Sequence, residues 1–448
     1  MNRLLAFLFL GSFIFSLGYA FYSRIPPAVD AKAYDAIAWN LAQGYGYKEN
    51  RDLAYEKDYA LGRAGPGYEF FLAGVYTAFG HRYWPVWILQ SIFHVLSGFF
   101  ILLTYRLFAK KENPDDKNKN SWLDWFVVLG LFLFLFHPDL IQMNGMLMTE
   151  PLFIFLTAGA LFAGLRVLAD SDYNFSSKWR LILIFAALAS FAVLVRPAAF
   201  LFFLIFAASF LYKKYWKEAA IIFAILLIAA GPWILRNYSR HGILFTNATG
   251  GLELWVSVLP ESGGEFQMNE EVSDYLSQNG LFKTAERGKE EFKNFIFKNP
   301  LSFLTRQLEK TSIYFSMLRT SGFWLYLSGS RRLITTIFSA IFNFLIFSLG
   351  LSGFYVLFKK KKFLNNLFLL ISASLPISVI PIIVTGRYRY AFLAFLTIGA
   401  IVILRFISEE KRIPGFVWLI SAFLILNSGL DAIWHFSKVL SHLKALGF

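Results

Sequence analysis

Long apolar runs separated by short polar breaks fill most of the 448-residue chain. A helix needs roughly 20 apolar residues to cross the hydrocarbon core of a bilayer, and eleven runs come near that length. We predict spans at about 4–22, 84–105, 123–137, 147–168, 180–195, 197–212, 218–235, 332–358, 364–385, 388–406 and 414–431. The pattern therefore predicts an all-α polytopic membrane protein.

The first apolar run has some features of a signal peptide. Arg3 supplies a positive start, and Gly18-Tyr19-Ala20 is similar to a small-x-small cleavage site. The run is long for a signal peptide, and the residues after it are suited to a membrane surface. We therefore expect residues 1–22 to be retained as a helix.

The polar breaks alternate in charge, which indicates the topology. One set is rich in Lys and Arg and defines the cytoplasmic side; it comprises Arg106, Lys110, Lys111, Lys117 and Lys119, then Lys178 and Arg180, then Lys213, Lys214 and Lys217, then Lys359 to Lys362, then Arg405, Lys411 and Arg412. Every other break then lies outside. Eleven spans place the C-terminus outside too, although Lys438 and Lys444 argue mildly against that side.

The first long outer segment covers residues 23–83. Between 23 and 68 it carries six basic and six acidic residues, a balance that indicates a structured polar layer rather than a polybasic tail. Apolar residues from Tyr34 to Leu41 follow helical spacing, and Gly44-Tyr45-Gly46-Tyr47 ends that helix. We expect a surface helix there and a second one from Glu69 to Phe79.

The second long outer segment covers residues 237–331, between an N-terminal transmembrane module (1–236) and C-terminal transmembrane helices (332–448). Glycines divide it into pieces. Asn269 followed by Glu270 reads as a helix start, a further helix is expected over 284–297, and an amphipathic run follows Pro300. We expect a small helical cap, called the outer cap below.

Composition supports this class and excludes others. The chain is 57% hydrophobic and 16% charged, against about a quarter charged in soluble proteins, and its mean hydropathy is +0.52. It has no cysteine, which excludes disulfides and thiolate chemistry. The net charge of +14 comes from the breaks between spans, so we expect the lipid bilayer as a partner and no nucleic acid.

Ionisable residues gather at the predicted outer ends of the helices. A lone arginine at a helix end is often a snorkelling side chain, but a group on one face suggests a polar cavity open to the outside. Asp30 is the most informative member, because it stands where a spanning helix meets water. The group contains Asp30, Arg63, Asp139, Glu150, Arg196, Arg236, Arg387 and Arg389.

Other catalytic patterns are missing from the sequence. There is no Walker loop, G-x-S-x-G or H-E-x-x-H motif, and the six histidines lack ligand spacing. Asp35 is offset five residues from Asp30 on the expected helix and would face elsewhere. The sequence holds no clear metal-ligand motif, so a divalent metal cofactor stays undetermined.

Several motifs occur in the order found in one family. The chain resembles bacterial membrane glycosyltransferases with the GT-C fold, in the branch of dolichyl-phosphate-mannose-protein mannosyltransferase-like proteins (glycosyltransferase family 39) and the aminoarabinose transferases. The motifs are Asp30-x-x-x-Tyr34 with Gly44-Tyr45-Gly46-Tyr47, Pro66-Gly67-Tyr68, Met148-Thr149-Glu150, Arg196-Pro197, Pro232-Trp233-x-x-Arg236-Asn237, Gly250-Gly251-x-x-Leu254-Trp255 and Arg387-Tyr388-Arg389. Glu69 and Tyr390 depart from the pattern, since the family often has proline next to these motifs.

The resemblance implies a polyprenyl-phosphate-linked sugar as donor, inversion at the anomeric carbon, and an active site on the periplasmic face of a bacterial inner membrane. It assigns Asp30 as general base. From its place at a helix end, Glu150 is expected either to hold the base or a basic side chain, or to be only a structural carboxylate. Positive side chains, guanidinium groups above all, bind phosphate oxygens. The expected donor-phosphate ligands are Arg387 and Arg389, with Arg63, Lys57 and Arg196 as further candidates. Tyr34, Tyr68 and Arg236 are expected to bind substrate.

The sugar and the acceptor stay open: the acceptor is a protein, a lipid or an envelope glycan. A transporter or flippase for lipid-linked glycans is the main alternative. Transporters often show interrupted helices in matching halves of the chain. Here the charges cluster at outer helix ends and the halves show no obvious repeat, which disfavours transport. A noncatalytic envelope scaffold and a polymerase of lipid-linked oligosaccharides are further alternatives.

Overall fold

The computed structural model describes residues 3–55, 58–63, 65–112, 125–169, 175–241, 249–263, 265–319 and 326–436. Throughout these ranges the regular structure is helical. Eight helices are long and apolar enough to cross a membrane. They are α1 (Arg3–Ser23), α4 (Trp84–Glu112), α7 (Thr149–Ala169), α8 (Phe175–Val195), α10 (Trp216–His241), α14 (Gly329–Lys359), α16 (Tyr390–Glu410) and α17 (Gly415–Trp434). The predicted all-α multi-pass architecture is confirmed.

The remaining three predicted spans fall on shorter helices. α5 (Trp125–Leu135) and α6 (Pro138–Asn144) are bent by 51° to one another and amount to one further span if taken together. α9 (Ala199–Tyr212) and α15 (Phe363–Val379) are apolar but too short to cross a bilayer as single straight helices. By length and composition, the described residues thus contain eight candidate spans, or nine with the bent pair, and two short apolar helices where about eleven spans were predicted.

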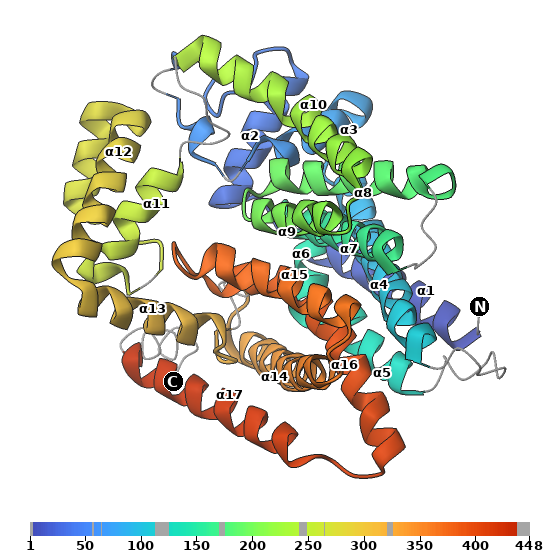
Figure 1. Ribbon diagram of the computed structural model, residues 1–448. Helices are drawn as coiled ribbons and strands as arrows, with labels where there is room; N and C mark the ends of the chain where they lie inside the picture. The colour runs from blue at the N-terminus through green and yellow to red at the C-terminus, as the bar shows by residue number, and fades with distance from the viewer. Residues whose placement is uncertain are drawn as a thin grey trace.

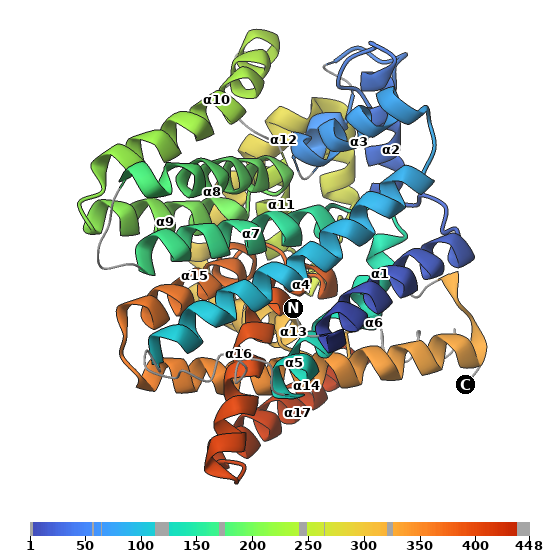
Figure 2. The same cartoon turned by 90° about the vertical axis from the view of Figure 1, so that its right-hand side faces the viewer.

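The first outer segment forms the two helices expected of it. α2 (Asp30–Ala42) begins at Asp30 itself, and Gly44 with φ of 81° and Gly46 with φ of 84° follow its end. α3 (Pro66–Phe79) begins with proline at its first position, where the missing N–H costs nothing. Figure 2 shows α2 and α3 beyond one end of the helix bundle, next to the start of α4.

The second outer segment contains α11 (Thr249–Val258), α12 (Glu270–Lys298) and α13 (Pro300–Tyr314). The Asn269 side chain accepts a hydrogen bond from the backbone N–H of Val272 at 3.0 Å, which caps α12 as predicted. Gly280 breaks α12 with φ of 75°, so the segment has the two helical pieces expected. Figure 1 shows α11, α12 and α13 together on one side of the bundle, near α2.

An apolar cluster joins the outer cap to the first outer segment. Ile37 of α2, Trp255 of α11 and Ile383 after α15 are buried in it, beside Trp233 of α10. The main core is separate and lies among the long helices. In that core α14 and α16 touch through glycine, since a Cβ on Gly353 would lie 1.8 Å from the carbonyl oxygen of Gly399. The smaller cluster therefore joins four segments that are distant in sequence: α2, α10, α11 and the stretch after α15.

Candidate active site at the start of α2

Asp30 is the first residue of α2, and its carboxylate remains about a quarter exposed. A carboxylate in the first turn of a helix is stabilised by the unpaired N–H groups there. Val29, just before it, has a φ of 50°, an unfavourable conformation for a β-branched residue. Such strain needs support from the surrounding fold, and it often occurs at functional sites.

Arg387 forms an ion pair with Asp30 through its Nη2 and the carboxylate Oδ2. It lies on η4 (Gly386–Arg389), a short 3-10 turn that leads into α16. Like Asp30, its side chain is a quarter exposed. The two members of the pair are thus held by separate elements and are both open to a ligand.

Arg63 approaches Asp30 from the other side, with its Nη1 3.9 Å from Oδ1. Its guanidinium also donates to both carboxylate oxygens of Glu49, at 2.7–3.1 Å. The Asp58 carboxylate accepts hydrogen bonds from the backbone N–H groups of Glu49, Asn50 and Ala60, so it fixes the turn that carries this pair. Arg63 is therefore partly engaged and partly available near Asp30.

Arg196 follows the last residue of α8, and its Nη1 donates to Oε1 of Glu150 at 2.8 Å. Glu150, in the first turn of α7, is 2% exposed, and Thr149 donates to its other oxygen. The Arg196 guanidinium also lies 4.8 Å from the ring centre of Tyr388, beside Arg387. Glu150 thus binds a basic side chain directly, namely that of Arg196.

Two glycines let the segment that follows Arg63 pack against the end of α8, next to Arg196. A Cβ on Gly65 would lie 2.4 Å from the Leu194 carbonyl oxygen, and one on Gly67 would lie 2.7 Å from the Val195 nitrogen. The start of α3 thus rests directly on the last turn of α8. A side chain at either glycine would force these backbones apart.

The arginines determine the charge state of Asp30. Burial disfavours the charged carboxylate, but the guanidiniums of Arg387, Arg63 and Arg196 outweigh burial and hold the pKa of Asp30 below its usual value. Asp30 is therefore ionised at neutral pH. It is also a weak base for as long as Arg387 holds it.

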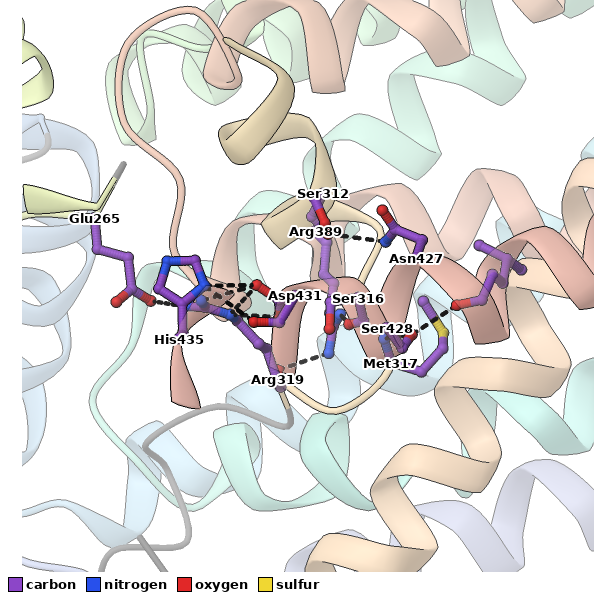
Figure 3. Close-up of polar contacts among 11 residues, drawn as sticks. Glu265, Ser312, Ser316, Met317, Arg319, Arg389, Asn427, Ser428, Asp431 and His435 are labelled. Carbon is purple, nitrogen blue, oxygen red and sulfur yellow. Dashed lines mark hydrogen bonds and ion pairs between the residues drawn. The ribbon is translucent and has the colours of Figure 1, made fainter. Parts of the chain in front are cut away.

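Arg389 does not join this cluster, which corrects its assignment as a phosphate ligand. Its side chain is fully buried and donates to the backbone carbonyls of Ser316 and, at 2.7 Å, Arg319. Arg319 in turn binds Asp431 of α17 and Glu265 of the outer cap, and Asp431 contacts His435 (Figure 3). Arg389 therefore ties the Arg387 turn to the end of α13.

Two predicted substrate ligands are also core residues. Tyr34 is 4% exposed and Tyr68 is fully buried, and their rings pack edge to face at 5.6 Å. The Tyr68 hydroxyl donates to Oε1 of Gln90 at 2.8 Å. Both tyrosines are therefore core residues near the start of α2 and present little surface to a ligand.

The other predicted residues lie elsewhere. Arg236 is surrounded by the rings of Trp233, Tyr47 and Tyr55, and donates to Asn237. Asp139 is buried and accepts from Ser339, Asn343 and Tyr390 between α6, α14 and α16, so it does not reach the outer surface. Asp35 faces away from Asp30, as predicted, toward Tyr76, Tyr83 and His81. Lys57 lies outside the described residues.

One charged residue near the cluster was missed by the sequence reasoning. Glu253 of α11 lies close enough to feel the charges of Arg196, Arg387 and Asp30. A signal was present, because Glu253 is the one charge within the apolar run Leu252 to Val258. For metal binding, the described ranges contain no group of three His, Asp or Glu residues that could hold an ion.

Comparisons with known proteins give a likeness in fold only. No family model matches the sequence, and no curated protein matches it either. Among solved structures, the chain is similar to ArnT from Cupriavidus metallidurans bound to undecaprenyl phosphate, with 10% identity, a TM-score of 0.40, and coverage of 93% of this chain and 82% of that one. The apo state of that protein matches with 10% identity and a TM-score of 0.40, over 88% and 77% of the two chains. Likeness at this level leaves the roles of the site residues to their own contacts.

Proposed function

We propose that the chain is a GT-C-type membrane glycosyltransferase. It transfers a sugar from a polyprenyl-phosphate donor to a hydroxyl-bearing acceptor at the outer face, and Asp30 is the general base. The observation that carries this proposal is the partly exposed Asp30–Arg387 pair, with Arg63 and Arg196 beside it, at the end of an apolar helix bundle. A base beside phosphate-binding cations at a lipid boundary is what such a reaction requires.

The chemistry follows from the charges. The acceptor oxygen attacks the anomeric carbon from the face opposite the phosphate, and its proton passes to the Asp30 carboxylate. The bond between the anomeric carbon and the phosphate oxygen breaks, and the electron pair leaves with the polyprenyl phosphate. Guanidinium groups bind phosphate oxygens well, so Arg387 and Arg63 stabilise the charge that grows there.

Donor binding also explains how an ion-paired carboxylate can act as a base. The donor phosphate is an anion and competes with Asp30 for the Arg387 guanidinium. Weaker pairing and a new negative charge nearby both raise the pKa of Asp30. The base thus becomes stronger once the donor is in place.

The apolar helices supply the other half of the donor site. A polyprenyl chain remains in the bilayer while its phosphate reaches the polar boundary, where Asp30 and Arg387 lie at helix ends. Holding both substrates at one interface removes much of the entropic cost of their encounter. The outer cap, which packs against α2 through Ile37, is placed to keep water from the sugar.

The test is transfer of radiolabelled sugar from a panel of polyprenyl-phosphate monosaccharides, using membranes with mixed envelope acceptors. Wild-type protein should transfer the label, and Asp30→Asn should reduce transfer by about a thousandfold or more with normal folding. Asp274→Asn is the matched control, because Asp274 is an exposed carboxylate on α12. Full turnover by Asp30→Asn would refute the base assignment. Failure of wild type with every donor would refute the proposal and favour transport of lipid-linked glycans.

A further inference from the structure

Glu253 is held rigidly on the outer cap. It lies on α11, whose backbone contacts α12 so closely that a Cβ on Gly251 would be 2.1 Å from the carbonyl oxygen of Ala285. Trp255, on the same side as Gly251, packs on Tyr275 of α12 with ring centres 5.5 Å apart. Successive helix residues are about 100° apart, so Glu253 lies nearly opposite Gly251. Its side chain therefore leaves α11 on the face away from α12.

The neighbours of α11 on its other faces belong to the Asp30 site. Leu252 is fully buried in the apolar cluster that contains Ile37 of α2 and has Tyr388 packed against it. Ile37 lies two turns after Asp30, and Tyr388 follows Arg387. Glu253 is thus brought to the Asp30–Arg387 pair from the side of the outer cap.

Among the residues that the structure describes, Glu253 has charged neighbours at a distance and no direct ion-pair partner. It feels the positive charges of Arg196 and Arg387 and the negative charge of Asp30, while burial raises its pKa above the usual value. Within the described residues its carboxylate forms no hydrogen bond or ion pair. A half-buried carboxylate without donors is costly unless a ligand supplies them.

The charge of Glu253 indicates which part of the donor it would bind. A polyprenyl phosphodiester is an anion and carries no hydrogen-bond donor, so Glu253 repels it and leaves it to the arginines. Sugar hydroxyls donate hydrogen bonds and suit a carboxylate acceptor. The sugar is joined directly to the phosphate that Arg387 would bind, so it is the group that comes within reach of Glu253.

We propose that Glu253 binds hydroxyl groups of the donor sugar from the outer-cap side, opposite the arginines that bind the phosphate. This inference rests on the proposed function. It adds a sugar-recognition site on α11. The arginines around Asp30 would bind the donor phosphate, and a carboxylate of the outer cap would bind the sugar. The outer cap would then select the sugar.

The experiment measures the affinity of purified protein for two probes: the polyprenyl-phosphate monosaccharide that wild type uses best, and undecaprenyl phosphate without a sugar. Glu253→Ala should bind the sugar-bearing donor about tenfold or more weakly. Its affinity for undecaprenyl phosphate should stay within about twofold or rise, because a negative charge is lost. Glu253→Gln should keep much of the donor affinity, since an amide oxygen still accepts a hydroxyl hydrogen bond.

Glu290→Ala is the control, because Glu290 is an exposed carboxylate elsewhere on the outer cap. Equal loss of both probes in Glu253→Ala would overturn the inference, as would unchanged affinity for both. Normal donor binding with slower transfer would also overturn it and move Glu253 to the acceptor. Wild type that binds neither probe would instead refute the proposed function, so the two failures are distinguishable.

Discussion

Asp30 and Arg387 form an ion pair although 357 positions separate them in the chain. Asp30 begins α2 in the first outer segment, and Arg387 lies on the turn before α16. Asp30 follows α1 and Arg387 precedes α16, so the pair forms only when the N-terminal and C-terminal parts of the chain have packed together. The site is therefore a product of the whole bundle, and its activity should be sensitive to any change that shifts α16 against α2.

The ion pair predicts a specific change in pH dependence. In the wild type the arginines lower the pKa of Asp30, so the base stays ionised to below the usual range for aspartate. Replacing Arg387 with alanine removes the largest of these favourable charges, and burial then raises the pKa. We expect the acidic limb of the kcat/KM profile to move to higher pH in Arg387→Ala, with turnover reduced by about a hundredfold.

The measurement is a profile of transfer rate from pH 4 to 8. Arg82→Ala serves as the control, because Arg82 is an exposed arginine in the same outer segment. A lower rate with the acidic limb unmoved would mean that Arg387 acts on the donor only, and that another group titrates.

The Arg196–Glu150 pair predicts an asymmetric loss of stability. Glu150 is 2% exposed, whereas Arg196 is 14% exposed and stacks on Tyr388. Arg196→Ala would leave a buried carboxylate without its cation, at a cost of about 3–5 kcal/mol. Glu150→Ala should cost less, because Arg196 keeps its aromatic neighbour and some water.

The double variant completes the comparison. Thermal unfolding in detergent should show that Arg196→Ala with Glu150→Ala loses less than the sum of the single changes, with a coupling of about 1–3 kcal/mol. Strictly additive losses would show that the two side chains do not stabilise one another.

Hydropathy was enough to predict the helices, but it did not fix their lengths or the directions of the side chains. Apolar runs at 197–212 and 364–385 suggested full spans, while the helices there have 14 and 17 residues. Arg387 and Arg389 looked equivalent in sequence, yet one pairs with Asp30 and the other binds carbonyls at the end of α13. The difference arises from the 3-10 turn that carries them, whose phase cannot be read from residue spacing.

Tertiary contacts account for the other differences between the sequence-based predictions and the structure. Tyr68 belongs to one of the family motifs and was expected to bind substrate, but its ring is buried against Tyr34 and its hydroxyl is bound by Gln90. Glu253 is a lone charge in an apolar run, and residue spacing alone does not place it near Asp30. Its importance depends on the cluster that brings α11 to α2.

Replacing Arg389 should destabilise the protein without weakening its binding of the donor. Its buried guanidinium satisfies the backbone carbonyls of Ser316 and Arg319, so Arg389→Ala leaves both unpaired at a cost of roughly 2–4 kcal/mol. The melting temperature should fall, and the folded fraction should keep its KM for donor. Arg389→Lys should recover part of the stability, because it keeps the charge but not the fork of donors. A raised KM at unchanged stability would restore Arg389 as a phosphate ligand.

The burial of Glu69 should make the stability of the protein depend on pH. The residue lies in the first turn of α3 and is fully buried. Burial raises the pKa of Glu69 to about 8, against partial opposition from the Tyr47 hydroxyl and Arg63. Between the ordinary glutamate pKa of 4.5 and this value, the folded protein holds a proton that the unfolded chain releases. The cost of ionising buried Glu69 is therefore absent at low pH, and stability falls as the pH rises from about 5 to 8.

Glu69→Gln should remove this dependence, because glutamine stays neutral at every pH. We expect the apparent melting temperature of the wild type in detergent to fall between pH 5 and 9, and that of Glu69→Gln to fall much less, with the largest gain over wild type at the alkaline end. The gain in free energy of unfolding is at most of order 5 kcal/mol, since each unit of pKa shift corresponds to about 1.4 kcal/mol. Glu286→Gln, on the exposed face of α12, is the control and should follow the wild type. Parallel curves for wild type and Glu69→Gln would mean that Glu69 is ionised in the fold and has found a cation.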